Sequence, residues 1–547
     1  MPTKIFCMQL RKILFYFIML LVLNSASLTA QVATEYSQNE VYNYLSRMDQ
    51  KGLVTFNDLI RPLSRIYIKS CLDSLQAKTQ QLSAIEKQEL EFYLRDFTDG
   101  KPLPDESAAN RNTYFTKDPF GRFRSISLQS KDFSMRIDPI LQYGTFQGKD
   151  QSVTQYGSGF NLYGYAGKHW SFYLSFNDVN EKGKGIDTTW SFSPQTGHST
   201  RIALNQKSHN YSQIRAGIYY QFKNGSIGFG QDQLSYGYGE NGRIVLSNKA
   251  PTYPHIRFDY SPLPWLSFNY THAWLNSNII DSSRTYNTGT STYGGRREQY
   301  INKYMAQHSI SFRIKRGLHI SLGESVVYSD QLNAGYLIPI SFFKAFEIQN
   351  ANRNINAGAN SQLFLSVSSR NNIKNTHLYG TLFIDEVRLS AIANSEKSRN
   401  QLGFTLGASV TDIGLPYLTA TAEYTRINPF VYRNLLPAQN YTHYGYSLGD
   451  WIGNNADRFL FNVKYTPIPR LKLLLQYQHF RKGGEGTLDQ QYFQQPQPPF
   501  LFNYMFNRNE WFLQSQYELY NNLYITGSYR TQNNGFTQGF LGFRYGF

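Results

Sequence analysis

The chain ends on FTQGFLGFRYGF, residues 536–547, in which apolar and small or polar side chains alternate. Alternation with a period of two is typical of a β-strand that has one apolar face. An apolar strand closing on a terminal Phe indicates a transmembrane barrel, because the outer-membrane barrel assembly machinery reads such an ending. The apolar set is Leu541, Phe543, Tyr545 and Phe547.

The same period continues upstream to about residue 120. Clear examples are Trp170 to Asn177, with Trp170 and Phe172 on one face, and the run from Leu471 to Gln478. In a soluble sandwich the apolar face points inward, whereas in a membrane barrel it points to lipid and the polar face lines the lumen. Alternation alone does not separate these two folds.

The connections favour the membrane barrel. Tight turns alternate with long polar loops, an asymmetry between two rims that is typical of outer-membrane barrels. Counting strands from Phe133 gives about 18, an even number, as bacterial single-chain barrels require. The tight turns fall at 167–169, 223–225, 316–317, 467–470 and 520–522, and the long loops at 178–210, 276–305, 330–360, 428–457 and 481–508.

Composition agrees with a barrel that carries aromatic girdles. Aromatic residues make up 16% of the 547 residues, with 42 Tyr and 39 Phe, while charged residues make up only 17%. Tyr and Trp place an apolar ring in lipid and a polar tip at the headgroups. After the first residues, no stretch approaches the 18 or so apolar residues that a membrane-spanning helix needs.

The first 30 residues predict a signal peptide, and hence export. Lys4, Arg11 and Lys12 precede an apolar run from Ile13 to Leu23, followed by small residues before Gln31. Their removal would lower the formal net charge from +16 to about +13, which favours anionic partners such as acidic glycans and lipopolysaccharide phosphates. Cys71 would then be the one remaining cysteine, so no internal disulfide is expected.

Residues 36–99 carry helical spacing instead. Ser64 is a candidate N-cap, and Ser83 with Glu86 predicts a capping box. We therefore expect a small bundle of three short helices, with possible docking faces around Leu72 and Leu94. The expected domains are a signal peptide (1–30), a periplasmic helical bundle with a linker (31–112) and an outer-membrane barrel (113–547).

Catalytic motifs are missing from the sequence. It holds no GxSxG elbow, HExxH helix, P-loop or paired CxxC motif, and SYGYGENG (235–242) precedes no helix. The neighbours Asp385 and Glu386 could form a carboxylate pair, although ionic contacts in the lumen are commoner. We expect a non-enzymatic protein with no cofactor, no metal site and no nucleic-acid partner.

Binding chemistry is better represented, because the long loops combine aromatic rings with amide and guanidinium groups. Sugars bind aromatic faces, with amides and carboxylates at their hydroxyls, and acidic sugars add Arg or Lys. The alternative is that these rings belong to the aromatic girdle, and that QQYFQQPQPPF (490–500) is only a solvated loop. The candidate glycan-binding residues are Trp190, Tyr286, Tyr293, Arg296, Arg297, Tyr441, His443, Tyr444 and Trp451.

Several blocks, in order along the chain, resemble the Wzi family of capsule-assembly outer-membrane proteins. They are RPLSR (61–65), LSAIEKQELEF (82–92), GFGQDQLSYGYGENGRIVLSNKAPTYP (228–254), NKYMAQHSISFRI (302–314), LYGTLFIDEV (378–387), AEYTRINPFVYR (422–433) and NYTHYGYSLGDWIGNNADRF (440–459). The resemblance extends to RemB-type gliding-motility proteins of the Bacteroidetes.

The resemblance implies a periplasmic helical bundle on an outer-membrane barrel whose extracellular loops act as a lectin for capsular polysaccharide. A second hypothesis is a gliding or adhesion component that acts through protein partners, with the bundle contacting a periplasmic protein. A third is a diffusion porin, against which the inward-folding loops and the bundle argue, since both predict a plugged lumen. The resemblance leaves the polysaccharide and the individual sugar contacts open.

Overall fold

The computed structural model describes residues 34–98, 112–118, 120–186, 201–202, 208–289, 294–353, 358–387 and 399–546. The expected signal peptide and nearly all of the expected linker lie outside these residues. So do three residues singled out in the sequence, namely Trp190, Tyr293 and Phe547.

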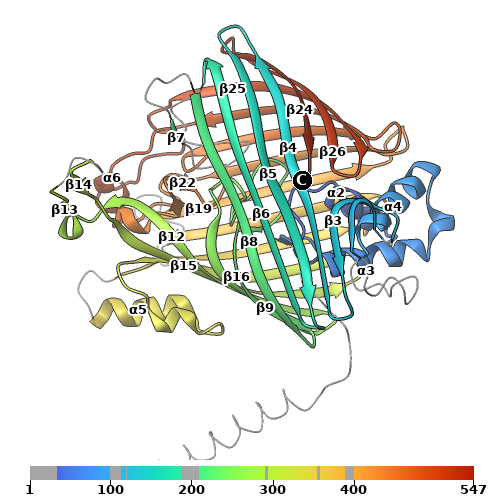
Figure 1. The fold of residues 1–547 in the computed structure, drawn as a ribbon. Coiled ribbons are helices and arrows are strands. Elements are labelled where there is room, and N and C mark those ends of the chain that lie inside the picture. The colour runs from blue at the N-terminus through green and yellow to red at the C-terminus, as the bar shows by residue number, and fades with distance from the viewer. Residues whose placement is uncertain are drawn as a thin grey trace, which may run out of the picture.

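Eighteen antiparallel strands close into a barrel, as the sequence predicts (Figure 1). The last strand pairs with the first, which begins at Phe133, the residue from which the strands were counted. The strands are β4 (Phe133–Gln147), β5 (Ser152–Ala166), β6 (Trp170–Lys184), β8 (Ser208–Phe222), β9 (Gly225–Asp232), β11 (Tyr253–Leu263), β12 (Leu266–Ile280), β15 (Tyr300–Lys315), β16 (Leu318–Ser329), β17 (Asn360–Arg370), β18 (Thr376–Val387), β19 (Asn400–Thr411), β20 (Leu418–Ile427), β23 (Ala456–Tyr465), β24 (Leu471–Lys482), β25 (Phe506–Tyr520), β26 (Leu523–Gln532) and β27 (Thr537–Tyr545).

A short hairpin, β2 (Thr113–Lys117) and β3 (Phe123–Gln129), adds to the sheet at the closing seam. β3 pairs with residues 134–137 of β4, and β27 pairs with residues 141–147 of the same strand. The hairpin therefore continues the sheet past the barrel at the end where β4 begins.

Burial along the strands shows which face points to lipid. On β6 Trp170 is exposed, whereas Ser171 and Tyr173 are buried; on β27 Leu541 and Phe543 are both exposed. The apolar side chains of each strand face outward, and the alternate side chains line the lumen. This is the arrangement of a transmembrane barrel and the reverse of a soluble sandwich. Within the residues that the structure describes, no helix has both the length and the apolar character to cross a membrane.

The helical unit, residues 34–98, contains the three expected helices, α2 (Val41–Gln50), α3 (Arg65–Gln76) and α4 (Ala84–Asp96), with β1 (Ile60–Arg61) and the turn η1 (Thr79–Gln81). Ser64 accepts a hydrogen bond from the Tyr67 amide, and Ser83 with Glu86 forms the capping box of α4. Leu72, expected on a docking face, is fully buried, and Leu94 packs against the same core. The apolar stripe of α3 is used inside the unit.

The two ends of the barrel differ as expected (Figure 1). All eight hairpin turns at the end that carries the helical unit are short, including the five predicted ones. The long connections lie at the other end, although the strands extend further into them than the sequence suggested. One connection that the sequence did not single out, residues 233–252 between β9 and β11, is also long.

The remaining elements lie in these connections. They are β7 (Arg201–Ile202), β10 (Ser235–Tyr236), η3 (Ser282–Arg284), β13 (Tyr286–Asn287), β14 (Arg296–Arg297), η5 (Ala334–Leu337), α5 (Phe343–Arg353), η7 (Pro437–Gln439), β21 (Thr442–His443), β22 (Tyr446–Ser447) and α6 (Leu488–Tyr492).

Candidate functional site

Residues 233–252 fold into the lumen and reach the helical unit. β10 pairs antiparallel with β1, with Ile60 opposite Tyr236. The Tyr236 hydroxyl lies 2.6 Å from Oγ of Ser321 on the barrel wall. A backbone ladder between two segments so distant in sequence satisfies polar groups that would otherwise be unpaired inside the barrel. This inward segment and the helical unit therefore meet inside the barrel.

A second segment, residues 428–455, packs against the first. The hydroxyls of Tyr432 and Tyr441 donate to the carbonyls of Ile244 and Val245, at 2.5 and 2.8 Å. The apolar cluster around them also takes in wall residues from many different strands, among them Ala273, Phe364 and Phe480. These strands are neighbours on one side of the barrel, from β11 to β24, so the two inward segments form a plug that packs against that side of the lumen. The inward-folding loops expected from the sequence are therefore present.

A buried ion pair fixes the second segment to the wall. Arg458 on β23 donates to both carboxylate oxygens of Asp450, at 3.0 and 2.9 Å, and none of these groups is exposed. Glu423 lies 3.5 Å from the same guanidinium and accepts a hydrogen bond from Tyr379 at 2.7 Å. Buried charges persist when they are paired and hydrogen-bonded, so these contacts hold one arrangement of the plug.

The helical unit closes the end of the barrel with the short turns. Arg370 of β17 donates to Asp49 at 3.2 Å, to Asp58 at 2.7 Å and to the Phe56 carbonyl at 2.7 Å. Arg47 of α2 pairs with both Glu86 and Asp412, the latter on the turn between β19 and β20. Charge-assisted contacts on several strands thus fasten the unit to the rim.

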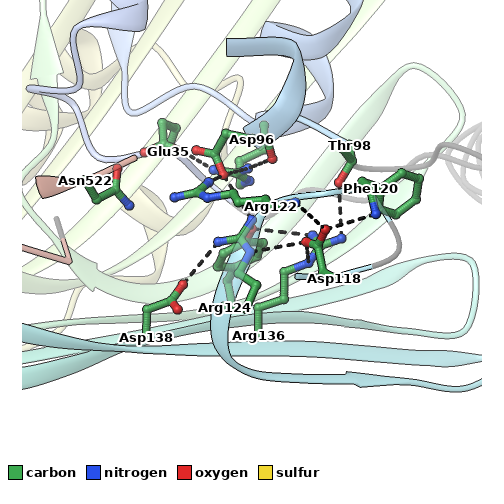
Figure 2. Close-up of polar contacts among 12 residues, drawn as sticks. Glu35, Asp96, Thr98, Asp118, Phe120, Arg122, Arg124, Arg136, Asp138 and Asn522 are labelled. Carbon is green, nitrogen blue, oxygen red and sulfur yellow. Dashed lines mark hydrogen bonds and ion pairs between the residues drawn. The ribbon is translucent and has the colours of Figure 1, made fainter. Parts of the chain in front are cut away.

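A further ionic cluster joins the unit to the closing seam (Figure 2). Arg124 of β3 lies 3.1 Å from Asp96 of α4 and 3.1 Å from Asp138 of β4. Asp118 accepts from the Arg122 amide at 3.0 Å, and Arg136 donates to the Thr98 hydroxyl at 3.1 Å. The hairpin β2–β3 therefore bridges the last helix and the first barrel strand.

A polar cavity of about 480 Å³ remains between the helical unit and the inward segment 233–252. Glu240 projects into this region and pairs with Lys464 of β23 at 2.5 Å. Arg61, Arg243 and Lys249 also line it. The lumen therefore holds a polar space between the helical unit and the apolar plug.

Three of the candidate glycan-binding residues are buried inside the molecule. Tyr441 stacks on Tyr432 with ring centroids 5.6 Å apart, and Trp451 packs edge-on against Phe480 at 5.5 Å. His443 accepts a hydrogen bond from the Asn276 amide at Nδ1, at 2.9 Å. The sequence placed all three in surface loops, but the segment that carries them turns into the lumen. They present no ring face to a surface glycan in this structure.

Four other candidates are accessible at the end with the long loops. Tyr286 and Tyr444 are 52% and 44% exposed. Arg296 and Arg297 are exposed as well, and the two-stranded hairpin β13–β14 sets Arg297 opposite Tyr286. The Tyr444 amide donates to the carbonyl of Asn276 near the end of β12, beside the start of this loop. An aromatic ring and two guanidinium groups thus share one hairpin, and a second ring lies on a neighbouring segment.

The structure adds a groove that the sequence did not indicate. A cavity of about 160 Å³ near the ends of β19 and β20 is lined by Asn400, Arg426, Asn428 and Phe500, among others. The Arg426 guanidinium lies over the Phe500 ring, 3.9 Å from its centroid. The sequence treated 490–500 as a solvated loop, since nothing local shows that Phe500 meets an arginine from a distant strand.

The adjacent carboxylates do not form a pair. Asp385 is buried and accepts hydrogen bonds from the Tyr432 amide at 2.7 Å and from Gln362 at 3.2 Å. Glu386 pairs instead with Arg399 at 2.9 Å. Successive residues of a strand point to opposite faces, so the two groups are separated by the sheet. Across the described part of the chain, no group of three or more His, Cys, Asp and Glu side chains is placed to hold a metal ion.

Comparison with solved structures identifies the fold. No family model and no curated protein sequence matches the chain. The chain is similar to the solved structure of Wzi, with a TM-score of 0.58 and 13% sequence identity. Wzi is an outer-membrane protein involved in group 1 capsule assembly in Escherichia coli, and it is a carbohydrate-binding β-barrel. The match covers 95% of this chain and 100% of that one. The Wzi-like fold expected from the sequence is confirmed.

More distant barrels match over a smaller share of the chain. OccK3 of Pseudomonas aeruginosa has a TM-score of 0.40 at 11% identity, and covers 75% of this chain and 95% of its own. OccAB2 of Acinetobacter baumannii has a TM-score of 0.43 at 12% identity, and the match covers 75% of this chain and 97% of OccAB2.

Proposed function

We propose that this protein is a non-enzymatic outer-membrane lectin or scaffold that attaches capsular polysaccharide, or another exopolysaccharide, to the cell surface. Its fold is that of a carbohydrate-binding barrel involved in capsule assembly. The observation that carries the proposal is the plug, because two long connections that pack inside the lumen leave the barrel better suited to binding a partner at its loops than to serving as a pore. The net positive charge favours an acidic polymer.

The difference between the two rims implies an orientation in the membrane. Outer-membrane barrels keep short turns on the periplasmic side and long loops outside. The helical unit would then lie in the periplasm, and the hairpin β13–β14 would project from the cell. Lipopolysaccharide phosphates would contact basic residues near the rim that carries the long loops. The barrel assembly machinery would insert the chain into the membrane.

The glycan site would centre on the accessible candidates. Tyr286 and Tyr444 offer ring faces to the C–H surfaces of sugars, and Arg296 and Arg297 offer bidentate donors to their carboxylates. Trp190 and Tyr293 belong to the same proposed surface by their place in the sequence. The groove at Arg426 and Phe500 is a second place where a sugar unit fits the side chains.

Binding of purified acidic polysaccharides to the protein in micelles tests the site. The double variant Tyr286→Ala/Arg297→Ala should bind about tenfold more weakly, equivalent to roughly 1.4 kcal/mol. The matched control is Tyr520→Ala, because Tyr520 is an exposed Tyr at the opposite end of the barrel. Equal loss in both variants would show that the hairpin is not the site.

A deletion strain tests the function itself. Cells that lack the protein should release their capsule into the medium, and the wild-type gene should restore attachment. Unchanged attachment, together with no binding on a glycan array, would contradict the proposal. Normal attachment combined with defective spreading on surfaces would favour the gliding hypothesis instead.

A further inference from the structure

The connection between β16 and β17, residues 330–353, folds back along the outside of the barrel; we name it the outer flap. It contains η5 and α5, and Figure 1 shows α5 outside the wall, near the end with the long loops. Tyr336 and Phe343 of the flap pack in one buried cluster with Tyr270, Ala306 and Tyr328 of β12, β15 and β16.

The strand parity shows that this cluster lies on the outer face. Ala273, Met305 and Val327, which belong to the same three strands, are part of the apolar cluster inside the lumen. Successive side chains of a strand alternate between faces. Tyr270, Ala306 and Tyr328 have the opposite parity and therefore point outward, to the side where the rest of the wall meets lipid.

Beneath the flap the outer wall is polar, which is unusual for a lipid-facing surface. Nε2 of His308 lies 3.1 Å from Glu324, and Nε2 of His272 lies 2.8 Å from the Tyr328 hydroxyl. Glu324 lies near the middle of β16, well away from either rim. A carboxylate at such a depth is costly in contact with hydrocarbon. The flap covers these groups, and Glu324 and His272 are buried.

Glu324 also holds the flap in place. Its carboxylate accepts hydrogen bonds from the amides of Phe343 and Lys344, at 2.6 and 3.4 Å, which are the first two residues of α5. A carboxylate at a helix N-terminus satisfies free amides and interacts favourably with the helix dipole. Earlier amides of the flap are bonded locally, as in Tyr336 to the Asn333 carbonyl at 3.1 Å and Ser341 to the Ile338 carbonyl at 3.1 Å.

The other side of the flap is apolar and uncovered. Ile340 is 84% exposed and Phe342 is 59% exposed. Leu337, Ile338 and Ile348 are exposed too. The wall beside the flap continues this surface through exposed Ile310 and Leu322 on β15 and β16. An apolar patch of this kind on a soluble surface would mark an interaction site.

We propose that the outer flap is embedded in the membrane leaflet next to the long loops, with lipid acyl chains against Ile338, Ile340 and Phe342. The lipid-facing wall is continuous with the flap, so acyl chains that cover Leu322 would also reach these side chains. Several local amides are already bonded, which lowers the cost of placing the backbone of this segment in the hydrocarbon. The flap seals a polar window in the wall.

Spin-label accessibility in phosphatidylcholine vesicles tests the proposal. Nitroxide labels are placed at Ile340→Cys, at Leu322→Cys as the lipid-wall reference and at Tyr286→Cys as the water reference. Ile340 is largely exposed, so its replacement should not affect folding. The native Cys71 is buried, and burial raises the pKa of its thiol to about 12, which keeps it in the unreactive thiol form.

The label at position 340 should resemble the one at 322, with relaxation by oxygen at least severalfold stronger than by a water-soluble nickel chelate. The label at 286 should show the reverse order. Preferential relaxation of label 340 by nickel would place the flap in water and overturn the proposal. An immobilised label that neither reagent reaches would overturn it as well, since it would mean that a protein or a second copy covers the flap.

Discussion

Arg370 links the barrel wall to the helical unit through two carboxylates that ionise differently. Burial raises the pKa of Asp49 to about 6, although Arg370 opposes the shift. Burial also acts to raise the pKa of Asp58, but the guanidinium groups of Arg370 and Arg61 outweigh it and hold that pKa well below its usual range. Asp58 is therefore the permanent anion, and Asp49 is the group that titrates.

Replacing the two carboxylates should have unequal effects. Asp58→Asn leaves the buried Arg370 without its main counter-charge and should weaken attachment of the helical unit by about 3–5 kcal/mol. Asp49→Asn should cost about 1 kcal/mol or less, because it keeps a hydrogen-bonding side chain and removes a charge disfavoured by burial. Hydrogen exchange of the α2 amides measures both effects. Equal costs would contradict the assignment of Asp58 as the main anion.

Mild acid should strengthen this contact rather than weaken it. A carboxyl group with a raised pKa binds protons more readily in the folded protein, so the contribution of Asp49 to stability increases as the pH falls from about 7 toward 4. The contribution of Asp58 is lost only when the pH falls below its usual range, through its lowered pKa. Protection of α2, corrected for intrinsic exchange, should rise at pH 5 by on the order of 1–2 kcal/mol. Asp49→Asn should abolish the rise.

At the scale of elements, the closing seam between β4 and β27 depends on side-chain size. Phe540 points into the lumen and packs against Phe146, with ring centroids 4.6 Å apart, over Gly144 of β4. A Cβ on Gly144 would lie 2.5 Å from the Phe540 ring. The glycine thus leaves space for an aromatic ring from the neighbouring strand.

Gly144→Val should displace Phe540 and destabilise the barrel by about 1–3 kcal/mol, as overpacking usually does. The temperature at which the protein loses its fast-migrating form on gels measures the effect. The matched control is Gly539→Ala on β27, where the nearest atom lies 3.7 Å from the added carbon. Unchanged heat resistance of Gly144→Val would mean that the seam repacks without cost.

At the scale of the whole molecule, closure of the barrel and closure of the lumen involve different residues. Strand pairing, including the seam, involves no residue of the helical unit. The plug, in contrast, uses β1 of that unit as the partner of β10. The barrel should therefore form without the unit, whereas its lumen should not stay sealed.

Deleting residues 36–99 should leave an assembled, heat-modifiable barrel, because every barrel strand keeps both neighbours. The intact protein should show little conductance in planar bilayers, and the deletion should show distinctly more. Failure of the shortened chain to insert would show that the unit is needed for folding. A large steady conductance of the intact protein would contradict the plugged lumen.

Strand faces, the number of strands and two helix caps could be predicted from local patterns in the sequence. The outward face of β6 and β27, the strand count from Phe133, and the caps at Ser64 and Ser83 all depend on residues close in sequence. A period of two assigns faces, and a cap bonds an amide three residues away. Each of these features was therefore predictable before any tertiary contact was known.

The positions of the aromatic side chains of the long loops follow only from tertiary contacts. Tyr441 and Tyr444 are separated by two residues, yet one is buried against the Val245 carbonyl and the other is exposed. The position of the outer flap also depends on a tertiary contact, because the N-terminus of α5 is capped by Glu324 of barrel strand β16. These outcomes depend on contacts between distant segments, and an aromatic loop has the same composition whether it turns inward to bury its rings or outward to present them.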